Sequence, residues 1–598
     1  MNNTIHGITV DYSRDNLFDE LGLKRLRESY MREEENSPQE RFAFVSRQFS
    51  SNDEHAQRLY DYSSKHWLSY STPILSFGRS KRGLPISCYL SFLHDSAEGL
   101  VDTLAEVNWL SMLGGGVGIG IGIRSADDKS TGIMPHLKTY DASSLAYRQG
   151  RTRRGSYAAY LDISHPDILL FLDMRKPTGD PNMRAMNLHH GVNITDDFMK
   201  LVEKSVLDSK ANDTWELKDP HSNIVKEKVS ARELWQRIIE LRMMTGEPYL
   251  HFITTSNKHL PEFQKALGLK ITQSNLCSEI LLPTDKERTA VCCLSSLNIS
   301  YCDEWKDDNL FIHDVAEMLD NVLNYFIKHA PNQIDKAKYS ASRERSIGVG
   351  ALGFHDYLQR NNIPFESALA VSKNKQIFKY IKTKLDESNI RLGKERGEAP
   401  DAAGTGRRFS HTPAIAPNAS SSSIMGNTSP SIEPYRANAY RQDTLSGAFL
   451  NKNKYLDKMI KEKCNENSKL DYNDIWSSII SSDGSVQHLD FLDAWTKDVF
   501  KTSMEIDQRW IVQHAADRQH YIDQGQSVNL FFRPDSNIKY VHAVHFMAWK
   551  TGLKTLYYCR SEKIGKADKI YKKIERKAIE ELDMKKLADG DECLACQG

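Results

Sequence analysis

Residues 84–123 read LPISCYLSFLHDSAEGLVDTLAEVNWLSMLGGGVGIGIGI, and this stretch indicates the fold class. Ile86 to Phe92 predicts a short apolar strand, Asp95 to about Leu113 predicts a helix, and Gly116 to Ile123 predicts a second strand. Strands that alternate with helices are typical of an α/β domain with a parallel sheet. We therefore expect an α/β core that begins near Leu84.

Together with the sequence on either side of it, this stretch divides the chain into three parts. Residues 1–80 are polar and helix-like, with charged runs such as Arg32-Glu33-Glu34-Glu35 that are typical of a solvated helix face. We expect residues 81–560 to form the α/β domain with inserted helical and small α/β segments. Residues 561–598 form a highly charged stretch followed by a tail.

Further elements are predicted within the central part. A stripe of apolar residues predicts a core helix from about His313 to Ile327. A second helix is predicted from Val541 to Lys550 and ends at Gly552, and Leu553 to Tyr558 predicts a strand. We find no internal repeat at the period of a solenoid.

Composition excludes several classes of protein. The chain has 79 Lys and Arg against 79 Asp and Glu, so no basic excess favours binding to nucleic acid. No apolar stretch approaches the thickness of a bilayer, and Met1-Asn2-Asn3-Thr4 does not open a signal peptide. Nine cysteines without the spacing of a secreted scaffold favour a reducing compartment, so we expect a cytosolic protein.

Two cysteines, Cys593 and Cys596, stand almost at the end of the chain. A terminus is mobile unless it is tied down, and two ligands do not complete a structural zinc site. The pair is therefore interpreted as a dithiol that cycles to a disulfide. Half of a shared metal site, or a tail without a function, are the alternatives.

The glycine run from Gly114 to Ile123 has the spacing GxGxG inside a predicted strand, which is not the dinucleotide-binding fingerprint. With a period of two, Gly118, Gly120 and Gly122 leave one face of the strand bare. Another backbone or a ligand can approach such a face closely. Close packing and ligand contact are about equally favoured.

Asn275, Cys277 and Glu279 stand at alternate positions, which in an extended strand places all three on one face. A carboxylate, an amide and a thiol together suit a sugar, because the carboxylate can take a hydroxyl proton and the thiol can react. A chance trio is the alternative. Cys88 and the pair Cys292-Cys293 are further candidates, although a buried free cysteine usually behaves as a small hydrophobe.

Two other motifs have more than one interpretation when only their residues are considered. Pro417 to Ile424 predicts a loop that opens a helix and points hydroxyl and N–H groups at an anion, although Ser-rich runs are more often flexible linkers. Tyr557 and Tyr558 end the predicted strand, and such a pair is also ordinary strand composition.

Taken in order along the chain, these motifs closely resemble the large, catalytic subunit of class I ribonucleotide reductase. The resemblance runs from about Ser71 to the last residue, through Ser87-Cys88, Asn275 to Glu279, Val291 to Ser295, Pro417 to Ser422, Ile432-Glu433-Pro434, Lys554 to Tyr558 and the terminal cysteines. It implies a ten-stranded α/β barrel with a finger loop through its middle, preceded by a short helical region.

The resemblance also implies residue roles. Cys277 would carry the thiyl radical that takes hydrogen from the ribose 3′ carbon, Glu279 would accept the 3′-hydroxyl proton and Asn275 would hold the hydroxyls. Cys88 and Cys292 would deliver two electrons and end as a disulfide, with Cys293 as the neighbour that does not take part. The terminal dithiol would then reduce that disulfide, with residues 561–589 as its tether.

The resemblance also implies residues that bind the substrate and an allosteric effector. The substrate would lie against Ser87, Gly115, Gly116 and the diphosphate loop Pro417, Asn418, Ala419, Ser420 and Ser421, with Ala419 where some relatives carry Glu. Asp95 and Arg124 match positions of an allosteric site for a deoxynucleoside triphosphate or ATP effector. Arg175 to Asn187, with Arg184, matches the loop that relays the effector's identity. With 87 residues before Cys88, we expect no N-terminal ATP cone and no shut-off by dATP through one.

The implied partners are a small subunit that holds the metal or tyrosyl radical, a second copy of the chain, and thioredoxin or glutaredoxin as reductant. Tyr557 and Tyr558 would relay the radical, and no metal site is expected in this chain. Cytoplasm, or host cytoplasm for a viral source, is the expected location. An adenosylcobalamin-dependent reductase is the alternative that the Tyr pair disfavours, and a thiol-disulfide or zinc-binding scaffold is a more distant one.

Overall fold

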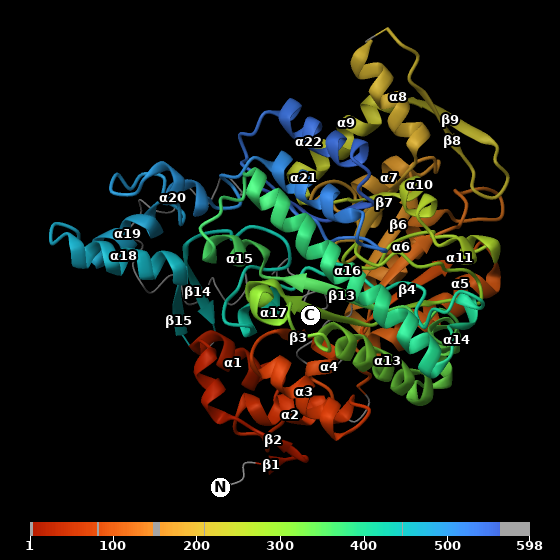
Figure 1. Cartoon of the computed structure of the whole chain (residues 1–598). Coiled ribbons are helices and arrows are strands. Elements are labelled where there is room, and N and C mark those ends of the chain that lie inside the picture. Colours follow the sequence, from red (N-terminus) through yellow and green to blue (C-terminus); the bar gives the residue numbers. More distant parts are fainter. Residues whose placement is uncertain (1–3, 81–82, 148–155, 209, 445–446, 562–598) are drawn as a thin grey trace.

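The computed structural model describes residues 4–80, 83–147, 156–208, 210–444 and 447–561. The predicted α/β core is confirmed (Figure 1). One seven-stranded sheet has the strand order β11-β4-β5-β6-β7-β10-β17. Its strands are β11 (Ala290–Cys292), β4 (Cys88–Leu93), β5 (Gly116–Ile121), β6 (Ser156–Asp162), β7 (His189–Ile194), β10 (Tyr249–Phe252) and β17 (Thr555–Leu556).

The five middle strands of this sheet are parallel and follow one another in the chain. Such neighbours need crossover connections, which here contain α5 (Ala97–Met112), α6 (Ile133–Ala146), α7 (Ile168–Asp173), and α8 (Asp196–Leu207) with α9 (Ala231–Thr245). The helix predicted from Asp95 begins at Ala97, because the side chain of Ser96 caps it by accepting the N–H of Gly99.

The remaining strands close the barrel. β13 (Gly348–Leu352) pairs in parallel with β12 (Leu294–Asn298), which pairs with β3 (Leu68–Tyr70). Single bridges join Val349 to Pro413 and Ile415 to Gln526, and β16 (Leu530–Phe532) pairs with β18 (Cys559–Ser561). The family's α/β barrel is thereby confirmed, as a curled sheet built from segments far apart in the chain.

Two helices predicted from the sequence are present, and each packs on another helix. The predicted core helix is α13 (Phe311–His329), which packs on the long helix α16 (Ala368–Arg396), and the predicted helix before Gly552 is α22 (Ile538–Lys550), which packs on α21 (Gln508–Gln519). The first residues form α1 (Glu20–Ser29), α2 (Pro38–Gln48), α3 (Asp53–Ser64) and α4 (Thr72–Leu75), at the bottom of Figure 1. A smaller core extends at the left, around α18 (Lys454–Glu466) and α19 (Tyr472–Ser481).

The strand predicted from Leu553 to Tyr558 is shorter than expected. Only Thr555 and Leu556 pair with β10, and the chain then changes partner. The N–H of Tyr557 donates to Val528 and the carbonyl of Tyr558 accepts from Leu530. The two tyrosines therefore lie at a switch between two sheets. Among the described residues, none of the helices combines the length and apolar character needed to cross a bilayer.

Candidate active site

A loop of residues 273–282, which we call the finger loop, passes directly across β5. A Cβ on Gly118 would collide with the carbonyl oxygen of Ser274 and lie 2.7 Å from the Cα of Asn275. On the other side of the loop, a Cβ on Gly525 would lie 2.9 Å from the carbonyl oxygen of Ser278. At Gly118, the bare face of the GxGxG strand is therefore used for contact with another backbone.

The tip of the finger loop is a tight turn. Ser278 has φ of +67°, and the hydroxyl of Tyr160 donates to the carbonyl of Asn275 at 2.7 Å and lies 3.1 Å from Ser278 Oγ. The expectation that residues 275–279 form an extended strand is wrong. A positive φ reverses the direction of the chain, so Cys277 and Glu279 reach one pocket through a turn.

The side chain of Asn275 forms hydrogen bonds within the finger loop itself. Its Oδ1 accepts the N–H groups of Glu279 at 3.0 Å and Ile280 at 3.1 Å. Its side chain therefore fixes the backbone that carries Glu279, and Asn275 is not among the residues that line the pocket.

Burial governs the charge of Glu279, which is 1 % exposed. Loss of solvent raises the pKa of Glu279 to about 7, although interactions with Asn275 and Ser527 oppose the shift. Ser527 Oγ lies 3.2 Å from Glu279 Oε2 and 2.5 Å from the carbonyl oxygen of Cys277. A carboxyl with a pKa close to neutrality can both take and return a proton.

Cys88 and Cys292 are directly opposite each other on the antiparallel strands β4 and β11, and both are free thiols in this structure. Opposite residues in such a pair have Cα atoms about 4.5–5.5 Å apart, which lies within the range that a disulfide needs. Burial, and then the neighbouring thiol of Cys88, raise the pKa of Cys292 well above its usual range. Cys292 therefore keeps its hydrogen at neutral pH.

Cys293 lies on the other face of the chain. Its thiol donates to the carbonyl oxygen of Leu319 on α13 at 3.6 Å, within the main hydrophobic core. The alternation of side chains along a strand separates it from Cys292. Of the two neighbours, only Cys292 lines the pocket.

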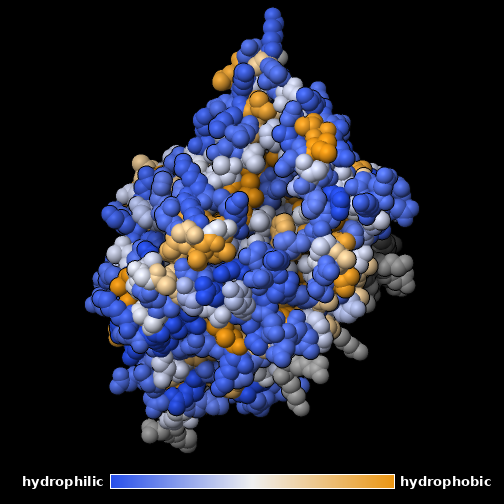
Figure 2. All heavy atoms as spheres, turned by 90° about the vertical axis from the view of Figure 1, so that its right-hand side faces the viewer, coloured by the Kyte–Doolittle hydropathy of each residue, from blue (hydrophilic) through white to orange (hydrophobic). Residues whose placement is uncertain are grey.

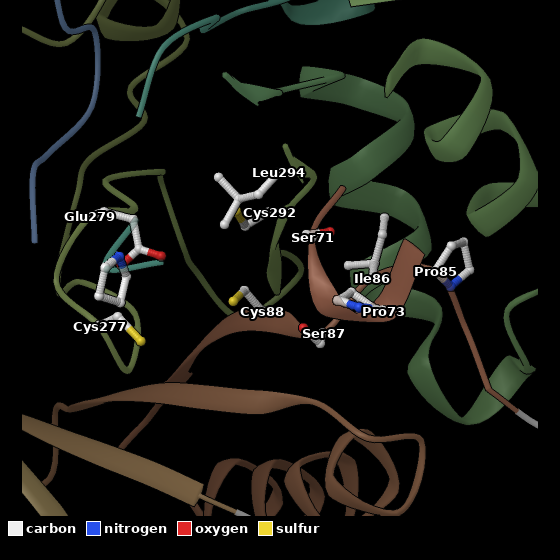
Figure 3. A pocket seen from close by; sticks show the side chains of 11 residues that line it. Ser71, Pro73, Pro85, Ile86, Ser87, Cys88, Cys277, Glu279, Cys292 and Leu294 are labelled. Atoms are coloured by element: carbon white, nitrogen blue, oxygen red, sulfur yellow. The ribbon is translucent and has the colours of Figure 1, made fainter. Parts of the chain in front are cut away.

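The pocket brings these groups together. Cys277 and Glu279 lie on one side of it, Cys88 and Cys292 line it next to them, and Ser71 and Ser87 lie farther along the wall (Figure 3). The remaining residues that line it are Pro73, Pro85, Ile86, Leu294 and Pro417. The hydroxyl of Ser71 is buried without a hydrogen-bond partner in the described part of the chain, so a polar ligand would satisfy it.

The Ser-rich segment is a helix and not a linker. Asn418, with φ of +54°, precedes α17 (Ala419–Ile424), and its Nδ2 donates to the carbonyl of Ala351 at 3.0 Å. Ser420, Ser421 and Ser422 are buried. Pro417 lines the inner pocket and also an outer groove, which Ala419 and Ser422 line as well.

Tyr557 and Tyr558 connect this groove with the finger loop. Their ring centroids are 4.3 Å apart, and both pack with Cys277, Leu276 and Tyr160 in one buried cluster. Both also line the outer groove, where Arg560 lies 4.2 Å from the centre of the Tyr558 ring. A row of aromatic rings therefore leads from the groove to Cys277.

The expected allosteric residues lie in two places. Arg124 Nε forms an ion pair with Asp95 Oδ2 at 2.8 Å, after the ends of β5 and β4. Arg184 donates to the carbonyl of Thr178 at 2.8 Å within its own loop. The ion pair brings Asp95 and Arg124 together, their role in holding an effector stays a prediction, and no described contact joins either residue to Arg184.

Gly115 and Gly116 take part in backbone packing. Gly116 donates its N–H to the carbonyl of Ser87 at 2.7 Å, and a Cβ on Gly115 would collide with the ring of Tyr89. Neither glycine is among the residues that line the pocket. Cys593, Cys596 and the tether lie outside the described residues.

Sequence reasoning missed several residues of the site. Ser527 and Tyr160 hold the finger loop, and Tyr249 packs 4.7 Å from Tyr557 and 5.1 Å from Tyr558. Each comes from a distant segment whose local pattern is ordinary, so no sequence signal marks them. His55, Asp314 and Glu317 could geometrically hold a metal. However, Arg58 and Arg396 already neutralise the two carboxylates, at 2.6 Å each.

Comparison with known proteins identifies the family. The model of the ribonucleotide reductase barrel domain matches residues 86–404 and 399–559, and that of the all-alpha domain matches residues 16–83. The large subunit of ribonucleoside-diphosphate reductase from Invertebrate iridescent virus 3 is 56% identical, over 94% of this chain and 97% of its own.

Two further relatives agree. A putative large subunit from Frog virus 3 is 47% identical over 91% of this chain and 92% of its own. The class Id ribonucleotide reductase alpha subunit of Actinobacillus ureae is structurally similar, with a TM-score of 0.81 and 34% identity over 92% of this chain and 99% of that chain. With its barrel, its finger loop and these relatives, the chain belongs to the large subunits of class I ribonucleotide reductases.

Proposed function

We propose that this chain reduces ribonucleoside diphosphates to 2′-deoxyribonucleoside diphosphates in the pocket between the finger loop and β4. The observation that carries the proposal is the meeting of Cys277 and Glu279 with the cross-strand thiols Cys88 and Cys292 in one buried pocket. An adenosylcobalamin-dependent mechanism is disfavoured by the adjacent rings of Tyr557 and Tyr558, which pack in one buried cluster with Cys277.

The reaction follows from the chemistry of these groups. Cys277, as a thiyl radical, takes the hydrogen atom from the ribose 3′ carbon, and Glu279 accepts the 3′-hydroxyl proton. The 2′-hydroxyl leaves as water, while Cys88 and Cys292 supply two electrons and two protons and become a disulfide. Cys277 then returns its hydrogen to the 3′ carbon. A pKa near 7 supports the role of Glu279, because the same carboxyl must take and return a proton.

The substrate is held by its sugar and its diphosphate. The buried serines of α17 and the N–H groups at the start of that helix suit an anion, and Pro417 connects this loop with the pocket. Asn418 is fixed by its bonds to Ala351 and Ser296, which supports a rigid loop at Asn418, Ala419, Ser420 and Ser421. Ser87 lies in the pocket wall, and Gly116 supports it by donating its N–H to the carbonyl of Ser87.

The oxidising equivalent comes from a separate small subunit, which membership of class I implies. In the proposed path it reaches Tyr558 from the outer groove and passes through Tyr557 to Cys277. Ring centroids 4.3 Å apart and a shared buried cluster with Cys277 support this path. The metal or tyrosyl radical belongs to the small subunit, so this chain alone is inactive.

Turnover requires a reductant. Cys593 and Cys596 would exchange with the Cys88–Cys292 disulfide and would themselves be reduced by thioredoxin or glutaredoxin. The pocket's burial supports such an intermediate carrier, because a bulky protein cannot reach Cys292, which is 4 % exposed. A cytoplasmic location, in the host for a viral source, fits a chemistry that needs reduced thiols.

Regulation and assembly complete the proposal. Asp95 and Arg124 would hold a deoxynucleoside triphosphate or ATP effector, and Arg184 would lie on the loop that reports its identity. A second copy of the chain would cover the apolar residues exposed on α5, namely Val101 (67%), Trp109 (38%) and Met112 (37%). Figure 2 looks onto the side of Figure 1 where α5 lies, and shows separate apolar patches there.

The test is a reduction assay with cytidine diphosphate, a small dithiol and a candidate small subunit. Cys277→Ser and Tyr558→Phe are expected to abolish turnover, whereas Cys293→Ser, which removes a thiol outside the pocket, retains it. Undiminished turnover in either of the first two variants would refute the mechanism. Activity that needs cobalamin and no small subunit would favour the alternative class.

A further inference from the structure

A loop of residues 175–187, which we call the relay loop, lies between α7 and β7, and its first residue binds its far end. Arg175 Nη1 donates to the carbonyl of Met186 at 2.8 Å and to the carbonyl of Leu188 at 3.3 Å. Beside these bonds, the N–H of Ala185 donates to the carbonyl of Met174 at 2.9 Å. The side chain of Arg175 therefore closes the relay loop at its base.

The same guanidinium lies against a buried carboxylate from another crossover. Arg175 Nε is 3.3 Å from Oε2 of Glu247, which stands between α9 and β10 and is 1 % exposed. Glu247 also accepts the backbone N–H of His190 at 3.1 Å and lies 2.6 Å from His189 Nδ1. Because His189 and His190 begin β7, Glu247 joins Arg175 to the strand that follows the relay loop.

Charge makes this contact hard to separate. Burial would raise the pKa of Glu247, but Arg175 and then His189 outweigh burial and hold the pKa well below its usual range. Glu247 is therefore ionised at neutral pH. Removal of the guanidinium would leave a buried carboxylate without its cation, which is costly. The ion pair thus resists movement of the base of the relay loop.

The rest of the relay loop is held by α6. Lys138 Nζ donates to the carbonyl of Pro181 at 2.9 Å and to the carbonyl of Arg184 at 3.1 Å. Asp141 accepts the N–H of Asn187 at 2.6 Å. One helix therefore supports the middle and the end of the loop, while the guanidinium–carboxylate pair supports its base.

We propose that Arg175, held by Glu247, is a positioning residue for the choice of substrate, because it fixes the base of the relay loop while the loop reports which effector is bound. This inference rests on the proposed function, in which Arg184 lies on the loop that reports the effector. A loop passes on a small displacement only where its base does not yield, and packed, hydrogen-bonded supporting side chains provide such a base.

The test uses the full chain with its small subunit and a small dithiol. Rates of reduction of cytidine and guanosine diphosphate are measured with ATP and with each of several deoxynucleoside triphosphates. The effector response is the largest change that any effector causes in the ratio of the two rates. Arg175→Met removes the guanidinium, whereas Arg175→Lys keeps a charge opposite Glu247 and loses the planar fork that reaches both carbonyls.

The matched control is Arg237→Met. Arg237 Nη2 pairs with Asp173 Oδ2 at 2.5 Å, two residues before Arg175, without a described contact to the relay loop. This variant therefore removes a neighbouring guanidinium and leaves the base of the loop in place. Thermal midpoints of all variants are measured beside the rates.

We expect Arg175→Met to reduce the effector response by about fivefold or more, and Arg237→Met to keep it within about twofold. The N–H of Ala185 should exchange its hydrogen faster in Arg175→Met than in the wild type, because the base of the loop opens more often. Should Arg175→Met fail to fold, Arg175→Lys decides, with a loss of about twofold or more expected.

Glu247→Gln gives an independent check. It replaces an acceptor oxygen by a donor group opposite Arg175 and the N–H of His190, so its effector response should fall as in Arg175→Met. Because both changes break one contact, the double variant should lose no more than the worse single variant. Additive losses would show that the two residues act separately and would overturn the inference.

Two other results would also overturn it. One is a full effector response in folded Arg175 variants, even with a lower thermal midpoint, because that is the result of a role in folding alone. The other is an equal loss of response in Arg237→Met. A wild-type chain that reduces neither substrate, or that responds to no effector, would instead overturn the proposed function or its regulation, and this inference with it.

Discussion

Cys88 and Cys292 face each other across two antiparallel strands, with Leu90 and Ala290 as the next such pair on the same face of the ladder. The geometry of this position fits a disulfide without movement of the backbone. The oxidised and reduced enzymes therefore differ mainly in the two side chains.

The first prediction concerns this pair. In a chain that carries Cys593→Ser and Cys596→Ser, so that the tail cannot accept the disulfide, peptide mapping after a single turnover without reductant should find one disulfide, between Cys88 and Cys292. Cys293→Ser should give the same disulfide, because the Cys293 thiol is directed at Leu319 in the core. A Cys88–Cys293 disulfide in the wild-type enzyme would contradict the assignment.

The second prediction concerns the pH dependence of activity. Because Glu279 must be ionised to accept a proton and its pKa is about 7, kcat/KM should rise with pH around neutrality. Ser527→Ala removes a hydrogen bond that lowers this pKa, so the midpoint should move to higher pH. A shift to lower pH would show that Ser527 does not stabilise the carboxylate.

The third prediction follows from the same carboxyl and concerns stability. The folded protein raises the pKa of Glu279 from 4.5 to about 7, so the fold favours the protonated form and loses stability as pH rises through this interval. At about 1.4 kcal/mol per pKa unit, the loss is about 3 kcal/mol. Glu279→Gln should therefore gain stability over the wild type between pH 4 and pH 8, by denaturant unfolding, while losing activity.

A buried carboxyl elsewhere provides the control. The pKa of Glu344, buried beside Ser340 and Arg288, is also about 7. Glu344→Gln should leave the pH profile of kcat/KM unchanged. Equal pH profiles for Glu279→Gln and the wild type would contradict the role of Glu279.

The fourth prediction concerns the crossing of the finger loop over β5. A Cβ at Gly118 meets backbone of the loop, whereas a Cβ at Gly120 meets the side chains of Gln273 and Phe92. Since side chains can move more easily than backbone, Gly118→Ala should cost more activity and stability than Gly120→Ala. The measurements are thermal midpoints and turnover of both variants. Equal losses in Gly118→Ala and Gly120→Ala would show that the finger loop can shift.

The fifth prediction concerns Tyr160. Tyr160→Phe removes the bond to the carbonyl of Asn275 and should destabilise the protein by about 1–2 kcal/mol and lower kcat. The control is Tyr140→Phe, because the Tyr140 hydroxyl is buried without a partner in the described ranges. An unchanged kcat in folded Tyr160→Phe would show that the turn holds its shape without this bond.

The core elements were predictable because their periodicity is local. The strand that begins at Gly116 and the helix around Val315 and Val322 follow directly from periods of 2 and 3.6 residues. The closure of the barrel was predictable only through the family resemblance. It depends on pairings between distant segments, such as Leu250 with Leu556, that no local pattern reveals.

The site shows the same division. Cys277 and Glu279 do face one pocket, but a positive φ at Ser278 brings them there, and the spacing argument assumed an extended strand. Tyr160 and Ser527 carried no signal at all, because a tyrosine in a strand and a serine in a loop are ordinary composition. Only the fold brings their hydroxyls to the carbonyl oxygens of Asn275 and Cys277.

The contact of Gly525 with the finger loop sets the order in which a newly made chain can become an enzyme. Gly525 donates its N–H to the carbonyl of Glu279, and Tyr557 packs beside Cys277, so one wall of the site is built from the last segments described. A ribosome releases the loop long before these segments. The chain therefore holds no complete radical site during most of its synthesis, and a truncated translation product would lack the means to begin the reaction.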